Sequence, residues 1–111
     1  MIITLTPNSS VDYYIVTAQE MQPGIQNASR SYCLPGGKGL NVSLMLHQFS
    51  ISSTAATFLG GFTGNYIADS LSAYSHVQLA PVAIPDANRI NVKLRGVKEY
   101  DINSPGPVIL R

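Results

Sequence analysis

Cysteine, tryptophan and charged residues are all scarce in this sequence. Its 111 residues contain one cysteine, Cys33, so no disulfide can form within the chain, and a small fold held together by disulfides is excluded. No tryptophan occurs, and only 12% of the residues are charged against 45% that are hydrophobic. This composition is the opposite of that of disordered chains and predicts a folded domain with a core. The single cysteine favours a reducing compartment, and we expect a cytoplasmic protein.

Long hydrophobic runs and clusters of basic residues are also missing. Residues 1–6 are apolar but too few for a signal peptide, and no run approaches the length that spans a membrane. The formal net charge is +1, and lysine and arginine never form a run that could follow a nucleic-acid backbone. We therefore expect neither a membrane nor a nucleic acid as partner.

His47 and His76 have no clustered carboxylates beside them, so we predict no metal site and interpret both as structural or exposed residues.

Hydrophobic periodicity predicts alternating strands and helices over the first three quarters of the chain. Residues 1–6 are nearly continuously apolar, as in a strand buried in a parallel sheet, and residues 53–61 predict another strand. Two stretches have apolar residues at helical spacing, namely Val42, Met45, Leu46 and Phe49 in the first and Ile67, Leu71 and Tyr74 in the second. The order strand, helix, strand, helix predicts an α/β fold with a parallel sheet.

Further strand-like segments do not fit this simple order. They are residues 11–16, 30–34, 88–94 and 99–103. The third segment alternates strictly, with one face made of Ile90, Val92 and Leu94 and the other of Arg89, Asn91 and Lys93. Together with the fourth segment it predicts an antiparallel hairpin with one apolar and one polar face. Residues 108–111 begin another apolar element straight after a turn at 104–107, so we expect a fragment of a longer protein.

The glycine-rich stretch CLPGGKGLNVS, residues 33–43, joins a predicted strand to a predicted helix. It lacks the spacing of a Walker A loop and of the dinucleotide fingerprint G-x-G-x-x-G. A glycine turn before a helix lets backbone N–H groups approach a ligand, and the helix start favours anionic groups. Lys38 would add a positive charge for a phosphate, and Asn41 could bond sugar hydroxyls. The alternative is that the glycines only make the turn.

Four motifs in order, SVDYY, PGGKGLNVS, FLGGFTG and NRINVKL, resemble the N-terminal part of the ribokinase-like sugar kinases. Within that family the pattern is most similar to the phosphofructokinase B type, and there to the bacterial 1-phosphofructokinases. The resemblance extends over residues 1–108. It implies a parallel α/β core with a small β-sheet lid over the sugar. Residues 1–111 would then be the N-terminal part of one kinase domain, with lid strands at about 11–34 and 82–103 interposed in the core.

The resemblance also implies which residues bind a sugar phosphate. Asp12 matches the aspartate that bonds the sugar hydroxyls, and the glycine motif that holds the sugar corresponds to Gly36, Gly37, Lys38 and Asn41. The lid positions near the substrate correspond to Arg89, which approaches its phosphate, Asn91, Lys93 and Asn103. Without the resemblance, Asp12 could cap a turn, and Arg89 and Lys93 could be a solvated strand face. Two departures from the family pattern are Asn8-Ser9, where asparagine-proline is usual, and Asn27-Ala28, where asparagine-arginine is common.

The function implied is that of an ATP- and Mg²⁺-dependent kinase that converts fructose 1-phosphate to fructose 1,6-bisphosphate. The alternatives are a tagatose 6-phosphate kinase, or a non-catalytic sugar-phosphate-binding or dimerisation module. The family's catalytic aspartate follows a glycine-alanine-glycine motif that this sequence does not contain, and the ATP site belongs to the same region. We therefore predict no catalytic residue in this chain, an inactive isolated chain, and a homodimer formed through the lid.

Overall fold

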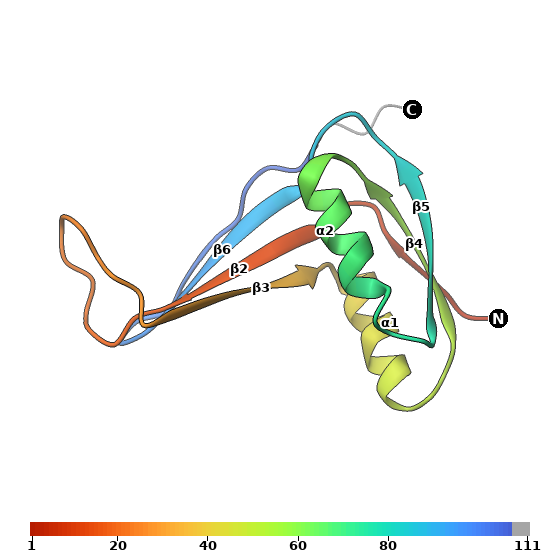
Figure 1. The fold of residues 1–111 in the computed structure, drawn as a ribbon, viewed down its shortest axis with the longest axis horizontal. Coiled ribbons are helices and arrows are strands. Elements are labelled where there is room, and N and C mark those ends of the chain that lie inside the picture. The colour runs from red at the N-terminus through yellow and green to blue at the C-terminus, as the bar shows by residue number, and fades with distance from the viewer. Residues whose placement is uncertain (108–111) are drawn as a thin grey trace.

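Two β-sheets of different construction dominate the computed structural model, which describes residues 1–107 (Figure 1). A parallel sheet has the strand order β1 (Ile3–Thr6), β4 (Ser53–Leu59), β5 (Val77–Ala83). A mixed sheet has the order β3 (Arg30–Gly36), β2 (Ser10–Val16), β6 (Arg89–Arg95), β7 (Tyr100–Ile102). Two helices, α1 (Lys38–Gln48) and α2 (Gly61–Leu71), complete the described part. None of its helices is long and apolar enough to cross a membrane.

The parallel sheet and the two helices form the α/β unit that periodicity predicts. The chain runs β1, α1, β4, α2, β5, with the mixed-sheet strands β2 and β3 inserted between β1 and α1. The small apolar core lies between the parallel sheet, the helices and the base of β2, and consists of Val11, Leu40, Ala55, Leu59, Ile67 and Leu71. The fold class expected from the sequence, a partial α/β core with a small separate β-sheet, is confirmed.

The mixed sheet projects from this unit as an arm, with residues 17–29 as a loop at its tip (Figure 1). Strand β2 pairs antiparallel with β3 and parallel with β6. Strands β6 and β7 form the predicted antiparallel hairpin, in which Val92 lies opposite Ile102 and Lys93 opposite Asp101. The arm gives the molecule its elongated shape, with extents of 49 × 35 × 18 Å.

Helix α1 is present, but the face predicted from its apolar residues is wrong. Val42, Met45 and Phe49 are 47%, 60% and 71% exposed, whereas Leu40 and Ser43 are fully buried. The helix packs on the sheet through hydroxyl groups, since Ser43 Oγ lies 2.8 Å from both Thr4 Oγ1 and Ser53 Oγ. Small polar side chains that satisfy one another can therefore replace an apolar interface and bring the helix close to the sheet.

Strand β1 is present too, but it is buried on one face only. Thr4 and Thr6 point toward α1 and are buried, while Ile3 and Leu5 are 62% and 65% exposed. Among residues 1–107 no helix covers that outer face of the parallel sheet.

Strand β5 was not predicted from the sequence. It contains Pro81, which cannot donate to a strand ladder, and it lies at an edge of the sheet, where proline is tolerated. The apolar element expected at 108–111 lies outside the described residues.

Candidate functional site

The sequence-predicted polar residues gather on one face of the mixed sheet, called here the polar face. Residues paired across neighbouring strands point to the same side, so strand register determines which side chains meet. Three rows cross β3, β2 and β6 in that order: Gly36–Ser10–Arg89, Leu34–Asp12–Asn91 and Tyr32–Tyr14–Lys93. The first two rows lie at the base of the arm, where β3 leads directly into α1.

Asp12 is the carboxylate of this region and is half-buried. Its Oδ1 accepts two hydrogen bonds, from the Ser10 hydroxyl at 2.8 Å and from Asn91 Nδ2 at 3.2 Å. Its Oδ2 lies against Gly36, where a methyl group on the glycine would be only 2.5 Å away. Gly36 is thus needed for close approach rather than for backbone freedom, since its φ is not in the left-handed region. The structure places Asp12 within a strand, so the turn-capping alternative is wrong.

The start of α1 lies immediately beyond Gly36. Gly37 has φ +128°, a conformation that L-residues rarely adopt, and a side chain there would collide with the methyl group of Thr6. No side chain caps the helix, and its first turn contains no acidic residue. The first-turn N–H groups therefore keep their partial positive charge available to a ligand. Lys38 and Asn41 are both exposed on this turn.

Arg89 continues the first row on the other side of Ser10 and is half-buried. Its Nε is buried and has no hydrogen-bond partner among the described residues. A buried N–H without a partner carries a free-energy cost, so an oxygen that accepted a hydrogen bond from Arg89 Nε would be favourable there. A phosphate oxygen is an acceptor of the appropriate charge.

Lys93 and Asn103 differ from the rest of the predicted set. Lys93 lies one row further along the arm, and its Nζ is 3.7 Å from Asp101 Oδ2. Asp101 also accepts a 2.8 Å hydrogen bond from Arg95, which lowers the pKa of the Asp101 carboxyl and raises that of Arg95. Lys93 is therefore part of an ion-pair cluster rather than an unpaired cation. Asn103 is exposed and follows the last residue of β7.

Asn91, predicted as a lid position near the substrate, is only 5% exposed. Its Nδ2 donates to Asp12, and its Oδ1 accepts a 3.2 Å hydrogen bond from the backbone N–H of Ser104. Ser10 and Ser104 are contributors that the sequence did not indicate. A signal for Ser10 was available, because it lies two residues before Asp12 and therefore on the same strand face.

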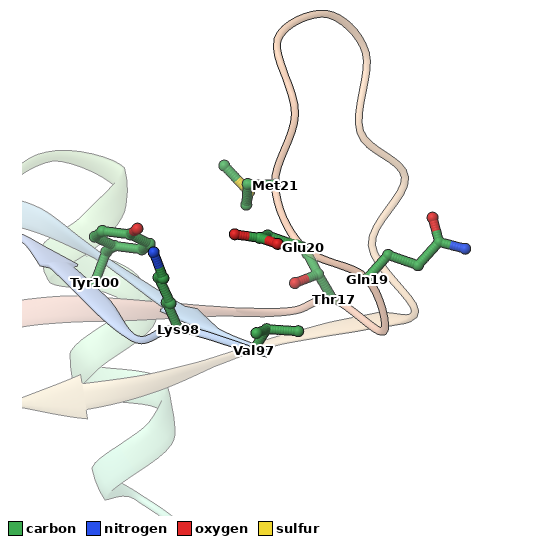
Figure 2. Close-up of a pocket in the computed structure, with 7 residues that line it drawn as sticks. All are labelled: Thr17, Gln19, Glu20, Met21, Val97, Lys98 and Tyr100. Carbon is green, nitrogen blue, oxygen red and sulfur yellow. The ribbon is translucent and has the colours of Figure 1, made fainter.

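A pocket at the tip of the arm lies far from Asp12 along the sheet (Figure 2). It is lined by Thr17, Gln19, Glu20, Met21, Val97, Lys98 and Tyr100. Figure 2 shows Glu20 and Met21 on the side of Tyr100, whereas Gln19 points away. Its volume of about 40 Å³ is too small for a sugar, and none of its lining residues belongs to the predicted set. The candidate site is placed at the base of the arm because the predicted residues gather there around Asp12.

Several known proteins are similar to this chain in sequence and in structure. No protein-family model matches the chain. It is 40% identical to 1-phosphofructokinase from Bacillus subtilis over 109 residues, which are 98% of this chain and 36% of that enzyme. It is 34% identical to D-tagatose-1-phosphate kinase from Bacillus licheniformis over 110 residues, again 98% and 36%. The crystal structure of phosphofructokinase-2 from Escherichia coli in complex with fructose-6-phosphate has a TM-score of 0.85 at 30% identity, covering 95% of this chain and 35% of its own. The chain thus spans about a third of the length of these relatives.

Proposed function

This chain is a relative of the ribokinase-like sugar kinases of the phosphofructokinase B type, and we propose that it supplies the part of such a kinase that binds the sugar phosphate. The binding site consists of the polar face at the base of the arm, around Asp12, and the first turn of α1. The mixed sheet acts as the lid over the sugar. The substrate is a ketohexose phosphate, and the reaction of the whole enzyme is the ATP-dependent phosphorylation of fructose 1-phosphate to fructose 1,6-bisphosphate.

The main support for this proposal is that a carboxylate and a guanidinium lie in adjacent rows of the polar face. Asp12 offers a carboxylate oxygen to hydroxyl groups, while Arg89 offers a buried N–H without a partner to an anion. Lys38 and the uncapped start of α1 add positive charge beyond Gly36. A sugar phosphate presents hydroxyl donors and a dianion a few ångströms apart, and this arrangement suits both.

Two ketohexose 1-phosphates are candidate substrates. The 1-phosphofructokinase from Bacillus subtilis and the D-tagatose-1-phosphate kinase from Bacillus licheniformis match the same extent of the chain, and the former is the more similar. We therefore favour fructose 1-phosphate and keep tagatose 1-phosphate as the second candidate, ahead of the tagatose 6-phosphate expected from the motifs. These sugars differ in the configuration at one hydroxyl, so discrimination would depend on hydrogen bonds to that group.

The described residues do not fit a nucleotide with its metal ion. Among residues 1–107 no three His, Cys, Asp or Glu side chains lie close enough together to hold a cation. The PGGKG turn also lacks the spacing of a triphosphate-binding loop. We propose that ATP, Mg²⁺ and the catalytic base belong to the part of the kinase that the chain does not span.

A homodimer formed through the arm is the proposed assembly. On the face opposite the polar one, Tyr13, Tyr100 and Ile102 are 36%, 47% and 56% exposed, and such apolar surface on a projecting sheet suits contact with a second copy.

For the location we propose the cytoplasm, since the exposed thiol of Cys33 would be stable in a reducing compartment.

A chimeric enzyme tests the proposed function. Residues 1–107 of this chain would replace the matching third of the Bacillus subtilis 1-phosphofructokinase, and a coupled assay would follow ADP release with each ketohexose phosphate. We expect turnover with fructose 1-phosphate and at least a tenfold lower kcat/KM with tagatose 1-phosphate. The matched control is the same chimera carrying Asp12→Ala, which should lose most of its activity. A folded chimera without turnover on either sugar, or one indifferent to Asp12→Ala, would contradict the proposal.

A further inference from the structure

Asp12 is held from one side only. A carboxylate has two oxygens and about four lone-pair positions for hydrogen bonds. The Ser10 hydroxyl at 2.8 Å and Asn91 Nδ2 at 3.2 Å occupy the two positions on Oδ1. No described side chain donates to Oδ2, which faces the bare Cα of Gly36. The acceptor capacity left for a ligand is therefore concentrated on one oxygen with a fixed direction.

Both donors are themselves fixed by burial. Ser10 is 1% exposed and Asn91 is 5% exposed, so neither side chain is free to turn toward a ligand in solvent. The amide of Asn91 is oriented by its second bond, in which its Oδ1 accepts from the N–H of Ser104 at 3.2 Å. The Asn91 side chain thereby connects the backbone at Ser104, which follows β7, to the Asp12 carboxylate. Asn91 keeps a second amide N–H, but the residue is only 5% exposed, so this N–H has little access to a substrate.

We propose that Ser10 and Asn91 are positioning residues that orient Asp12 for sugar hydroxyls, and that Asn91 does not itself bind the substrate. The pair fixes Oδ1 and leaves Oδ2 as the ligand acceptor, while the Ser104 bond couples this orientation to the position of residues 104–107. This inference rests on the proposed function, because it assigns roles within the same site.

Binding of fructose 1-phosphate to the 111-residue chain, measured by isothermal titration calorimetry at pH 7.5 and pH 5, tests the inference. The key variant is Asn91→Asp, which preserves shape and can still accept from Ser104 but replaces the donor to Asp12 with a second carboxyl group. At pH 7.5 two ionised carboxylates repel each other, whereas at pH 5 they can share a proton that restores the bond. Relative to wild type at each pH, we expect binding about tenfold weaker at pH 7.5 and nearly equal at pH 5.

Two more variants separate positioning from folding. Ser10→Ala removes the other donor without adding a charge and should weaken binding about tenfold at both pH values. Gln78→Glu adds the same charge as Asn91→Asp on an exposed position of β5 and should match wild type throughout. A variant that merely destabilises the fold lowers the number of binding sites per chain, whereas a misoriented Asp12 raises Kd at an unchanged number of sites.

The outcomes distinguish the inference from the function on which it rests. If the wild-type chain binds and Asn91→Asp differs from it by a constant factor at both pH values, or if Ser10→Ala binds like wild type, the positioning roles are wrong and the proposed function stands. If the wild-type chain does not bind fructose 1-phosphate at all, the proposed function fails and the inference fails with it.

Discussion

Replacing Gly36 with alanine should disable the site without disturbing the fold. An ideal Cβ at this position lies 2.5 Å from Asp12 Oδ2, 2.5 Å from Ser10 Oγ and 2.8 Å from Asp12 Cγ. Ordinary van der Waals contact begins at 3.4 Å, so the carboxylate must move by about 1 Å. A shift of this size takes the 2.8 and 3.2 Å hydrogen bonds to Oδ1 beyond the usual range. Asp12 would then lose both its position and its orientation.

The expected cost in affinity follows from the kind of bond that is lost. A hydrogen bond to a charged group contributes roughly 1.5–3 kcal/mol, which corresponds to a rise in Kd for fructose 1-phosphate of about 10- to 150-fold. Alanine at position 36 adds no backbone strain, because the φ of Gly36 is not left-handed, so the thermal unfolding midpoint should fall only by the cost of displacing the Ser10 and Asp12 side chains. Titration calorimetry gives Kd, and circular dichroism gives the unfolding midpoint.

Two controls make the Gly36→Ala result interpretable. Gly24→Ala makes the same chemical change in the tip loop, where no atom lies within 4 Å of the added methyl group, and should leave Kd unchanged while its φ of +106° adds local strain. In an Asp12→Ala background, Gly36→Ala should add little further loss of affinity, because the carboxylate whose displacement weakens binding is absent and only the collision with Ser10 remains. Unchanged affinity in Gly36→Ala, or full additivity with Asp12→Ala, would refute the reasoning.

Four further predictions follow from the same structure. The purified chain should transfer no phosphate from ATP to fructose 1-phosphate in a coupled assay, because the described residues lack a nucleotide site and a base; turnover above the enzyme-free blank would contradict this. The uncovered face of the parallel sheet around Leu5 should cause concentration-dependent association in sedimentation velocity, which Leu5→Lys reduces, and a monomer at all concentrations would argue against it. Arg89→Ala should raise Kd for fructose 1-phosphate about 10- to 150-fold and leave the weak binding of fructose itself unchanged, whereas equal losses for both sugars would remove Arg89 from the phosphate. Arg95 lowers the pKa of Asp101, so their ion pair stabilises the fold above the carboxyl's unfolded pKa of about 3.9, and this stabilisation is lost as pH falls through the lower folded pKa. Asp101→Asn should therefore lower the thermal unfolding midpoint slightly at pH 7 and not at pH 2. An equal difference at the two pH values would contradict the pairing.

Much of the fold could be predicted because strands and helices leave different periods in the sequence. The alternation of Ile90, Val92 and Leu94 with polar neighbours indicated β6 and its hairpin, and the spacing of Ile67 and Leu71 indicated the buried face of α2. The buried face of α1 was not accessible in this way. Its contact with the sheet is made by the hydroxyl groups of Ser43 and its partners, and a rule that counts apolar residues selects the exposed face instead.

The site could be predicted as a set of residues but not as an arrangement. Asp12 and Gly36 are far apart in the chain, and they meet only because Ser10 pairs with Gly36 in the β2–β3 register. The same limit applies to Lys93, whose ion pair with Asp101 depends on the register of β6 with β7. Residue types indicated charge and hydrogen-bonding capacity, whereas the direction of each group depended on pairings that no short motif contains.

The central claim is that the base of the arm binds a ketohexose phosphate, and amide NMR of the labelled chain tests it most directly. Titration with fructose 1-phosphate should produce saturable shifts in the N–H signals of Gly36, Gly37 and Lys38 and in the strand residues around Asp12. Fructose at the same concentrations should produce much smaller shifts, because it lacks the dianion that Arg89 and the start of α1 would bind. The absence of saturable shifts at millimolar fructose 1-phosphate, or shifts confined to the tip loop at 17–29, would contradict the account.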